Sequence, residues 1–190
     1  MRIVSALKLK PGLNIIVLYD GVCNICNSSV QFSMKRNNKP PIIHYASLQS
    51  KLGSYLTNYY KLPNDLSTSV LLRYHISDDF LKFNDRNLSP VLDKNKDYST
   101  DEIINTELSL LPQPELLMKS DASLELVRYL DYPWPITYIF KIFPKTFRDG
   151  VYDWWARNRY QNFGKTDSCQ APIPEWKERI LDWKEFQSSE

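Results

Sequence analysis

The sequence predicts an α/β fold, and three observations lead to that prediction. Short runs rich in β-branched residues alternate with longer runs whose apolar residues recur every three or four positions, as buried strands and amphipathic helices do. Glycine, proline and aspartate mark the boundaries between these runs. The 190 residues are 43% hydrophobic and 24% charged, which suits one globular domain. We therefore expect a single domain over 1–190 with its core at about 13–172.

The first strand is predicted at 14–19, a run that lies between a Pro-Gly pair and an Asp-Gly pair. From Cys23 the spacing changes, because Cys26, Val30 and Met34 follow one another at intervals of four. A cationic stretch and a proline pair then end the run. This part of the sequence predicts a helix that begins at the first cysteine.

Two further strands and two further helices continue the alternation. A strand is predicted at 42–46, a helix at 48–60 and a third strand at 69–74. After a polar interval, a helix is predicted from Ser120 to Leu130. Ser120 is the expected N-cap, because its hydroxyl can accept a hydrogen bond from the unpaired N–H groups of the first turn.

The polar interval, residues 78–114, is predicted to be an insertion. It is rich in Asp, Asn, Ser and Lys, and it contains one helix signal at 99–102, where Ser and Glu have capping-box spacing. The neighbour of the third strand stays open: residues 80–83 could form a hairpin with it, or 116–118 could pair with it after the insertion.

A long aromatic helix is predicted after the Ser120 helix. Phe147, Val151 and either Trp154 or Trp155 follow helical spacing, and the helix is expected to end near Tyr160, before Gly164. Its mixture of aromatic and cationic residues could form a platform for single-stranded nucleic acid, but helical spacing favours packing against the core.

The carboxyl-terminal tail, residues 173–190, is predicted to be a docked helix. Trp176, Ile180 and Trp183 have the spacing of one helical face. The tail would thus form a helical extension of the domain.

The charge and hydropathy of the chain argue against several partners. Lys and Arg number 24 against 22 for Asp and Glu, and a net charge of +2 is too small to predict a nucleic-acid partner. The longest apolar runs, 15–19 and 136–143, are shorter than the roughly 20 residues of a membrane-spanning helix, so no membrane segment is expected. The amino-terminal apolar run is too short for a secretory signal, which predicts a cytoplasmic protein and leaves an organelle open.

Cys23 and Cys26 form a C-x-x-C pair where the first strand gives way to a helix. A helix N-terminus stabilises a thiolate through its unpaired N–H groups and its dipole, so Cys23 is predicted to be the nucleophile. Cys26 lies one turn later and is predicted to resolve the mixed disulfide. Asp20 could accept a proton from Cys26 through water if burial raises the pKa of its carboxyl, or it could be a turn residue alone.

The stretch 19–26, Tyr-Asp-Gly-Val-Cys-Asn-Ile-Cys, resembles the signature of the DCC family of thiol-disulfide oxidoreductases. Later blocks resemble the same family in the same order, at 46–50, 120–122, 148–152, 158–164 and 169–172. The resemblance implies a thioredoxin-like sandwich, with a central mixed sheet flanked by helices, and a redox centre formed by Asp20, Cys23 and Cys26. The partners would be a thiol or disulfide substrate and an external electron donor, and no cofactor is required because the sulfur pair carries the electrons.

The sequence departs from this pattern in two places. The insertion 78–114 is longer than expected for the family, so it could cover or extend the site. Thr68 and Ser69 precede the third strand, where a thioredoxin has a cis-proline that presents its main chain to the substrate. This difference argues against peptide docking of the thioredoxin kind.

Three further residues are auxiliary candidates. Cys169 could form an alternative disulfide with Cys23, hold a redox partner, or pack as a small apolar side chain. Arg159 and Tyr160 could lie beside the dithiol, where the cation would favour the thiolate.

Two alternatives to redox chemistry stay open. One is a structural metal site, which needs about four ligands, and the other is a non-enzymatic interaction protein that keeps the fold.

Overall fold

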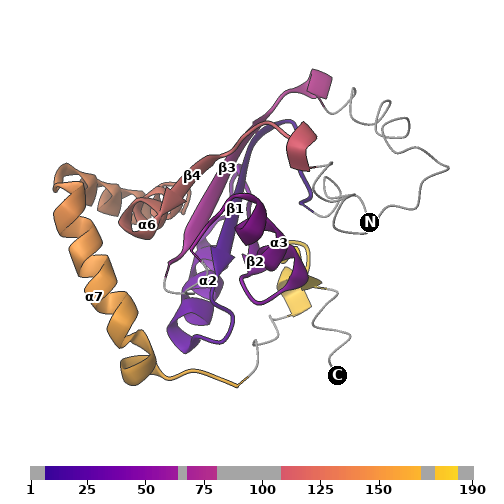
Figure 1. Cartoon of the computed structure of the whole chain (residues 1–190). Coiled ribbons are helices and arrows are strands. Elements are labelled where there is room, and N and C mark those ends of the chain that lie inside the picture. Colours follow the sequence, from indigo (N-terminus) through magenta and orange to yellow (C-terminus); the bar gives the residue numbers. More distant parts are fainter. Residues whose placement is uncertain (1–6, 64–67, 81–107, 168–173, 184–190) are drawn as a thin grey trace.

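The computed structural model describes residues 7–63, 68–80, 108–167 and 174–183. Its centre is a four-stranded sheet with the order β2-β1-β3-β4 (Figure 1). The strands are β1 (Gly12–Tyr19), β2 (Ile43–Ser47), β3 (Val70–Ile76) and β4 (Glu115–Met118). β1 runs parallel to β2 and antiparallel to β3, and β4 runs antiparallel to β3, so the sheet is mixed.

Helices cover both faces of this sheet. The side chains of α3 (Lys51–Tyr59) pack on one face, and those of α2 (Asn24–Arg36) and α6 (Lys119–Arg128) pack on the other. The remaining helices are η1 (Trp134–Ile142) and η2 (Pro174–Trp176), which are 3-10 helices, and α7 (Lys145–Phe163). The predicted α/β architecture, a mixed sheet between helices as in thioredoxin-like proteins, is confirmed.

The burial of β1 explains why its sequence is apolar without a break. Ile16 and Leu18 point into the core on the α3 side, whereas Ile15, Val17 and Tyr19 point into the core on the α2 and α6 side. Alternate residues of a strand face opposite sides of the sheet, so a strand that is covered on both sides needs apolar residues throughout.

The open question about the neighbour of β3 is settled in favour of the later segment. β4 pairs with β3 in the register Leu71 opposite Leu117, and so contains the predicted residues 116–118. The alternative was a hairpin formed by residues 80–83, of which 81–83 lie outside the described part of the chain. The helix signal at 99–102 also lies outside it. The division of the chain into one domain with an insertion stays a prediction.

The prediction that Ser120 caps α6 is wrong. The helix begins at Lys119, and the N-cap residue is Met118, which offers no side-chain acceptor. Met118 is also the last residue of β4, so the strand passes into the helix without a loop and a strand residue occupies the cap position. The hydroxyl of Ser120 instead donates to Asp149 of α7 and accepts a hydrogen bond of 2.9 Å from Arg148.

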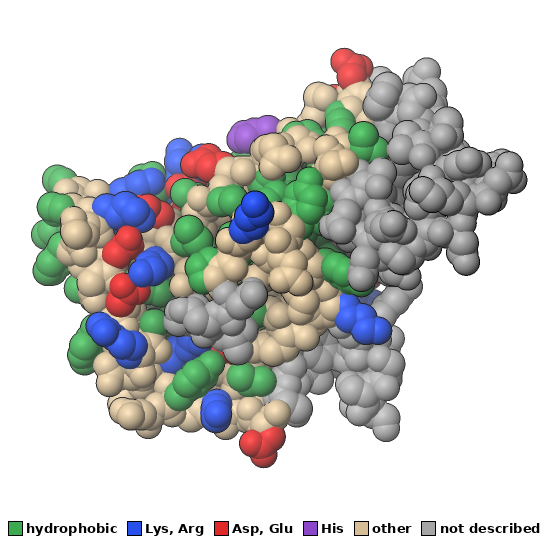
Figure 2. All heavy atoms as spheres, viewed as in Figure 1, with side chains coloured by type: hydrophobic (Ala, Val, Ile, Leu, Met, Phe, Trp, Pro, Cys, Tyr) green, Lys and Arg blue, Asp and Glu red, His purple; other side chains and the backbone are tan. Residues whose placement is uncertain are grey.

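The prediction that the aromatic stripe of α7 packs against the core is confirmed for Trp155 and Tyr160, which are half-buried, and is wrong for the rest of the stripe. The exposed fractions of Phe147, Val151 and Trp154 are 61%, 53% and 62%. Figure 2 shows hydrophobic side chains at the edge of the molecule where Figure 1 places α7. The buried residues of this helix are Ala156 and Arg159. Helical spacing identifies a stripe but does not decide which side of a helix meets the core.

Within 174–183, the tail does not dock as a helix. After η2, the main chain of Arg179 accepts a hydrogen bond from Tyr45 at 2.8 Å, and Leu181 donates one to Tyr45 at 2.9 Å. Ile180 thereby forms a parallel bridge with Tyr45 of β2 and is buried. β2 is an edge strand whose outward N–H and C=O groups need hydrogen-bond partners. An extended segment can pair with these groups, whereas a helix uses its own main-chain groups internally.

Every helix in the described ranges is too short or too polar to traverse a lipid bilayer.

Candidate dithiol site

The two sulfur atoms of the C-x-x-C pair lie together at the start of α2. Cys23 is the N-cap residue, and its Sγ accepts a hydrogen bond from the main-chain N–H of Cys26 at 3.4 Å. The thiol of Cys26 donates to the same sulfur at 2.6 Å, and both cysteines are free thiols. A disulfide bond is about 2.05 Å long, so a small movement of the side chains is enough to join the sulfurs.

Hydrogen bonding separates the acidities of the two thiols. The bond from the Cys26 thiol is the largest influence on Cys23 and lowers its pKa from the usual 9.0 to about 7, against the opposing effect of burial. The N–H group of Cys26 and the charge of Arg159 act in the same direction. The same thiol–thiol bond, together with burial, raises the pKa of Cys26 far above its usual range. Above neutral pH the reduced pair therefore holds one proton, on Cys26, and Cys23 is the thiolate.

Access to the two sulfurs differs. Cys23 is fully buried, and it forms an isolated antiparallel bridge with Lys165 in the segment that leads out of α7. The side chain of Asn24 and the main-chain carbonyl of Val22 hold this segment through hydrogen bonds of 2.9 Å each. Cys26 is half-buried. An incoming molecule therefore has a path to Cys26, whereas Cys23 is closed to solvent.

Asp20 is buried in the turn before the dithiol, and both oxygens of its carboxyl group are occupied. Oδ1 accepts hydrogen bonds from the Gln49 amide at 2.7 Å and the main-chain N–H of Val22 at 3.2 Å. Oδ2 accepts from Nη2 of Arg159 at 2.7 Å and from the Tyr160 hydroxyl. Four donors fix the carboxyl group, and with it the turn that leads into Cys23.

The structure brings Arg159 and Tyr160 to the dithiol through Asp20. A carboxyl oxygen of Asp20 and the sulfurs of Cys23 and Cys26 all lie within 4.8 Å of one another. Arg159 is 3% exposed, so its ion pair with Asp20 is buried. Arg159 lowers the pKa of Cys23 and Asp20 raises it. Because the two charges are paired, each partly cancels the effect of the other on the thiolate.

Gln49 belongs to the site, and the sequence interpretation gave it no role. Its amide oxygen accepts hydrogen bonds from the N–H of Gly21 at 2.9 Å and the hydroxyl of Ser47 at 2.6 Å, while its nitrogen donates to Asp20. The signal was its place two residues after the end of β2. Since β1 and β2 are parallel, the residues that follow them meet at the same edge of the sheet.

The same cluster contains side chains that can bind a metal ion. Asp20, Cys23 and Cys26 supply three potential ligand atoms, whereas a structural zinc ion takes about four. The carboxylate of Asp20 is already paired with a buried guanidinium group, whose positive charge opposes a second cation beside it. The donor set therefore fits a dithiol better than a metal centre.

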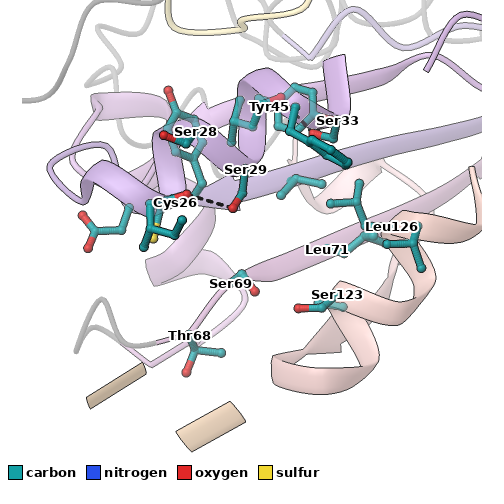
Figure 3. Close-up of a pocket in the computed structure, with 18 of the residues that line it drawn as sticks. Cys26, Ser28, Ser29, Ser33, Tyr45, Thr68, Ser69, Leu71, Ser123 and Leu126 are labelled. Atoms are coloured by element: carbon teal, nitrogen blue, oxygen red, sulfur yellow. Dashed lines mark hydrogen bonds between the residues drawn. The ribbon is translucent and has the colours of Figure 1, made fainter. Parts of the chain in front are cut away.

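A cavity of about 530 Å³ opens beside Cys26 (Figure 3). It lies between α2, one face of β1 and β3, and the helices α6 and α7. Cys26 lines it and Cys23 does not. The auxiliary candidate Cys169 lies outside the described residues.

The mixed sheet with helices on both faces and the C-x-x-C pair at the start of α2 define a thioredoxin-like dithiol protein. The chain belongs to the DCC1-like thiol-disulfide oxidoreductase family, whose model matches residues 17–85 and 79–165. The resemblance seen at 19–26 is thus confirmed.

Two relatives support this membership. The chain is 33% identical over 168 residues to the uncharacterized protein YuxK of Bacillus subtilis (strain 168), covering 88% of this chain and 94% of the relative. It is 29% identical over 157 residues to the DCC family protein At1g52590, chloroplastic, of Arabidopsis thaliana, covering 82% and 68% of the two chains. No solved structure matches the chain.

Proposed function

We propose that the protein is a thiol-disulfide oxidoreductase in which Cys23 and Cys26 alternate between a dithiol and a disulfide. The observation that carries the proposal is the 2.6 Å approach of the two sulfurs at the start of α2. An external donor would supply the electrons, and the substrate would be a thiol or a disulfide. Because each half-reaction exchanges one sulfur–sulfur bond for another, no further cofactor takes part.

Cys23 provides the thiolate. Its pKa of about 7 makes it ionised to a large extent near neutral pH, and a thiol of low pKa is also a good leaving group. When the pair is oxidised, attack on the sulfur of Cys26 releases Cys23 as this stabilised thiolate. When a mixed disulfide exists on Cys26, Cys23 attacks it and closes the internal bond.

Cys26 is the sulfur that meets the substrate. Cys26 lines the cavity, whereas Cys23 is fully buried, and thiol exchange requires physical access to the attacked sulfur. These roles reverse the order expected from sequence, in which Cys23 attacks first and Cys26 resolves. The low pKa of Cys23 favours the order expected from sequence, whereas the access to Cys26 favours the reversed order. Trapping of the mixed disulfide distinguishes the two orders.

Asp20, Arg159 and Tyr160 are positioning residues in this mechanism. Asp20 fixes the turn that leads to Cys23, and Arg159 and Tyr160 fix Asp20 from α7. The role of Asp20 as a proton acceptor would require a route from Cys26 to a carboxyl group that already accepts four hydrogen bonds. We therefore assign Asp20 to the geometry of the turn.

The test compares variants in a background in which Cys169 is replaced by Ser. Turnover of a disulfide with an excess of dithiol donor is measured for this background and for Cys23→Ser and Cys26→Ser. Both variants should lose turnover, since neither can close the internal bond. Unchanged turnover in Cys23→Ser would refute the dithiol mechanism, and turnover of the background protein no faster than the reaction without protein would favour a non-enzymatic interaction protein.

Mass spectrometry of the same variants assigns the roles. Cys23→Ser should accumulate a mixed disulfide on Cys26 faster than Cys26→Ser accumulates one on Cys23. The opposite ranking would restore the order expected from sequence.

The cytoplasmic location expected from sequence stays a proposal, and the plant relative described as chloroplastic keeps an organelle open.

A further inference from the structure

The cavity beside Cys26 has the size of a small-molecule site. Its volume of about 530 Å³ falls within the roughly 300–1,000 Å³ typical of ligand pockets. Its walls are largely aliphatic and aromatic, with Val17 and Leu71 on the sheet, Leu126 and Val127 on α6, and Trp155 on α7. Apolar walls of this extent can make many van der Waals contacts with a small molecule.

The hydroxyl groups in the walls donate their hydrogen bonds within the protein. Three serines on α2 and α6 donate to the carbonyl four residues earlier in their own helix: Ser28 to Asn24 at 3.0 Å, Ser29 to Ile25 at 2.8 Å and Ser123 to Lys119 at 3.2 Å. Ser33 and Tyr45 share a further bond of 2.7 Å. The walls therefore select by shape and apolar contact more than by hydrogen bonding.

The charges in the walls are paired with each other. Among the residues that the structure describes, Asp20 and Arg159 are the charged ones that line the cavity, and they form a buried ion pair at 2.7 Å. A charged thiol such as a γ-glutamyl tripeptide would bring its carboxylates next to walls whose described cation is already paired with Asp20, which is costly when the carboxylates lose water. This arrangement favours an uncharged occupant.

The main chain next to the cavity is also engaged. The N–H of Ser69 donates to the Tyr152 hydroxyl at 2.9 Å, and the carbonyl of Ser69 accepts a hydrogen bond from the N–H of Lys119 at 3.3 Å. An extended peptide would need such groups to pair with its own main chain. A small molecule does not need them.

We propose, resting on the dithiol function above, that the cavity binds an uncharged apolar small-molecule thiol or disulfide and presents its sulfur to Cys26. In Figure 3, Cys26 lies at one end of the space, and Ser29 and Ser123 lie on walls formed by different helices. For a disulfide R–S–S–R′, Cys26 passes its proton to Cys23 along their hydrogen bond and attacks the R sulfur, and R′–S leaves with the bonding electrons and takes that proton. Cys23, again a thiolate, then attacks Cys26, and R–S leaves with the bonding electrons as a thiolate that takes a proton from water. The protein loses two electrons and one proton, and the substrate gains them.

The probes are alkyl 2-pyridyl disulfides with methyl, butyl and hexyl chains, and a carboxypentyl analogue that matches the length of the hexyl probe. All release pyridine-2-thione, whose absorbance gives the rate of the first step with the reduced full-length protein lacking Cys169. The reaction of each probe with free dithiothreitol corrects for intrinsic reactivity. The corrected rate should rise at least about tenfold from methyl to hexyl, because added methylenes are buried, and the carboxypentyl probe should lose most of this gain.

Two variants that reduce the cavity from different helices test its location. Ser29→Phe and Ser123→Phe should each lower the hexyl-to-methyl rate ratio towards one. Ser54→Phe is the matched control, since Ser54 is an exposed helical serine on α3, on the other face of the sheet. It should leave the ratio unchanged. Thermal unfolding of each variant shows that it is folded.

The outcomes separate this inference from the proposed function. A wild-type protein that reacts with methyl and hexyl probes at equal corrected rates would overturn the cavity proposal and leave the dithiol function intact. If no probe reacts, the dithiol function fails, and calorimetry with the redox-inert hexyl phenyl sulfide tests the cavity alone. Binding that Ser29→Phe and Ser123→Phe weaken supports an apolar site, and absence of binding overturns it.

Discussion

Arg159 lies 2.7 Å from the carboxyl group of Asp20 although 139 residues separate the two along the chain, and both side chains are buried. The contact joins the turn before the dithiol to the last turns of α7. It also places a cation and an anion next to a cysteine pair, so its removal should change both the stability of the fold and the acidity of Cys23.

Arg159→Ala should lower the free energy of unfolding by about 3–5 kcal/mol, because it leaves the buried carboxylate of Asp20 without its partner charge. It should also raise the pKa of Cys23, since the charge of Arg159 lowers it. Urea unfolding measures the first effect. The pH dependence of thiolate ultraviolet absorbance measures the second without requiring access to the sulfur.

Two variants control this experiment. Arg157→Ala removes an exposed arginine of the same helix and should change stability by less than about 0.5 kcal/mol. Asp20→Asn removes the anion and should shift the pKa of Cys23 downwards, opposite to Arg159→Ala. Shifts of the same sign in both variants would contradict the electrostatic account.

The reduced dithiol should make stability depend on pH in a specific way. The unfolded chain loses both thiol protons near pH 9.0, whereas the folded pair loses the Cys23 proton near pH 7 and keeps the Cys26 proton. Between pH 7 and 9 the unfolded state binds more protons, so stability rises, by about 2 kcal/mol in total. Above pH 9 the folded state binds more, so stability falls.

The measurement is urea unfolding of the reduced protein between pH 6 and 10, compared with a Cys23→Ala/Cys26→Ala double variant that subtracts all other groups. The difference between the two proteins should have its maximum near pH 9. A flat difference would show that the hydrogen-bonded thiol pair does not form in solution.

Ile180→Ala tests the extended docking of the tail on β2. Ile180 is 1% exposed, and loss of a buried isoleucine side chain costs about 2–5 kcal/mol. Lys177→Ala, at an exposed position three residues earlier, is the control and should be nearly neutral. Equal unfolding midpoints for wild type and Ile180→Ala would show that the tail contributes nothing to the fold.

The order of the elements could be predicted because each depends on neighbouring residues. The run at 14–19 and the four-residue spacing from Cys26 to Val30 lie where β1 and α2 form. The predictions that failed depended on distant partners. Ser120 has a good capping side chain, but β4 ends at Met118 and the helix begins at Lys119, so Ser120 lies inside the helix. Ile180 has helical spacing, but it pairs with the edge of β2 in an extended segment.

The sequence by itself determined the α/β order, the family and the position of two cysteines at a helix start, since local spacing carries this information. Only the tertiary structure decided which sulfur opens to a cavity, which face of α7 is buried, and that Gln49 and Arg159 converge on Asp20. Those relationships arise when strands pair and helices pack, and they join residues whose separation along the chain gives no local pattern to read.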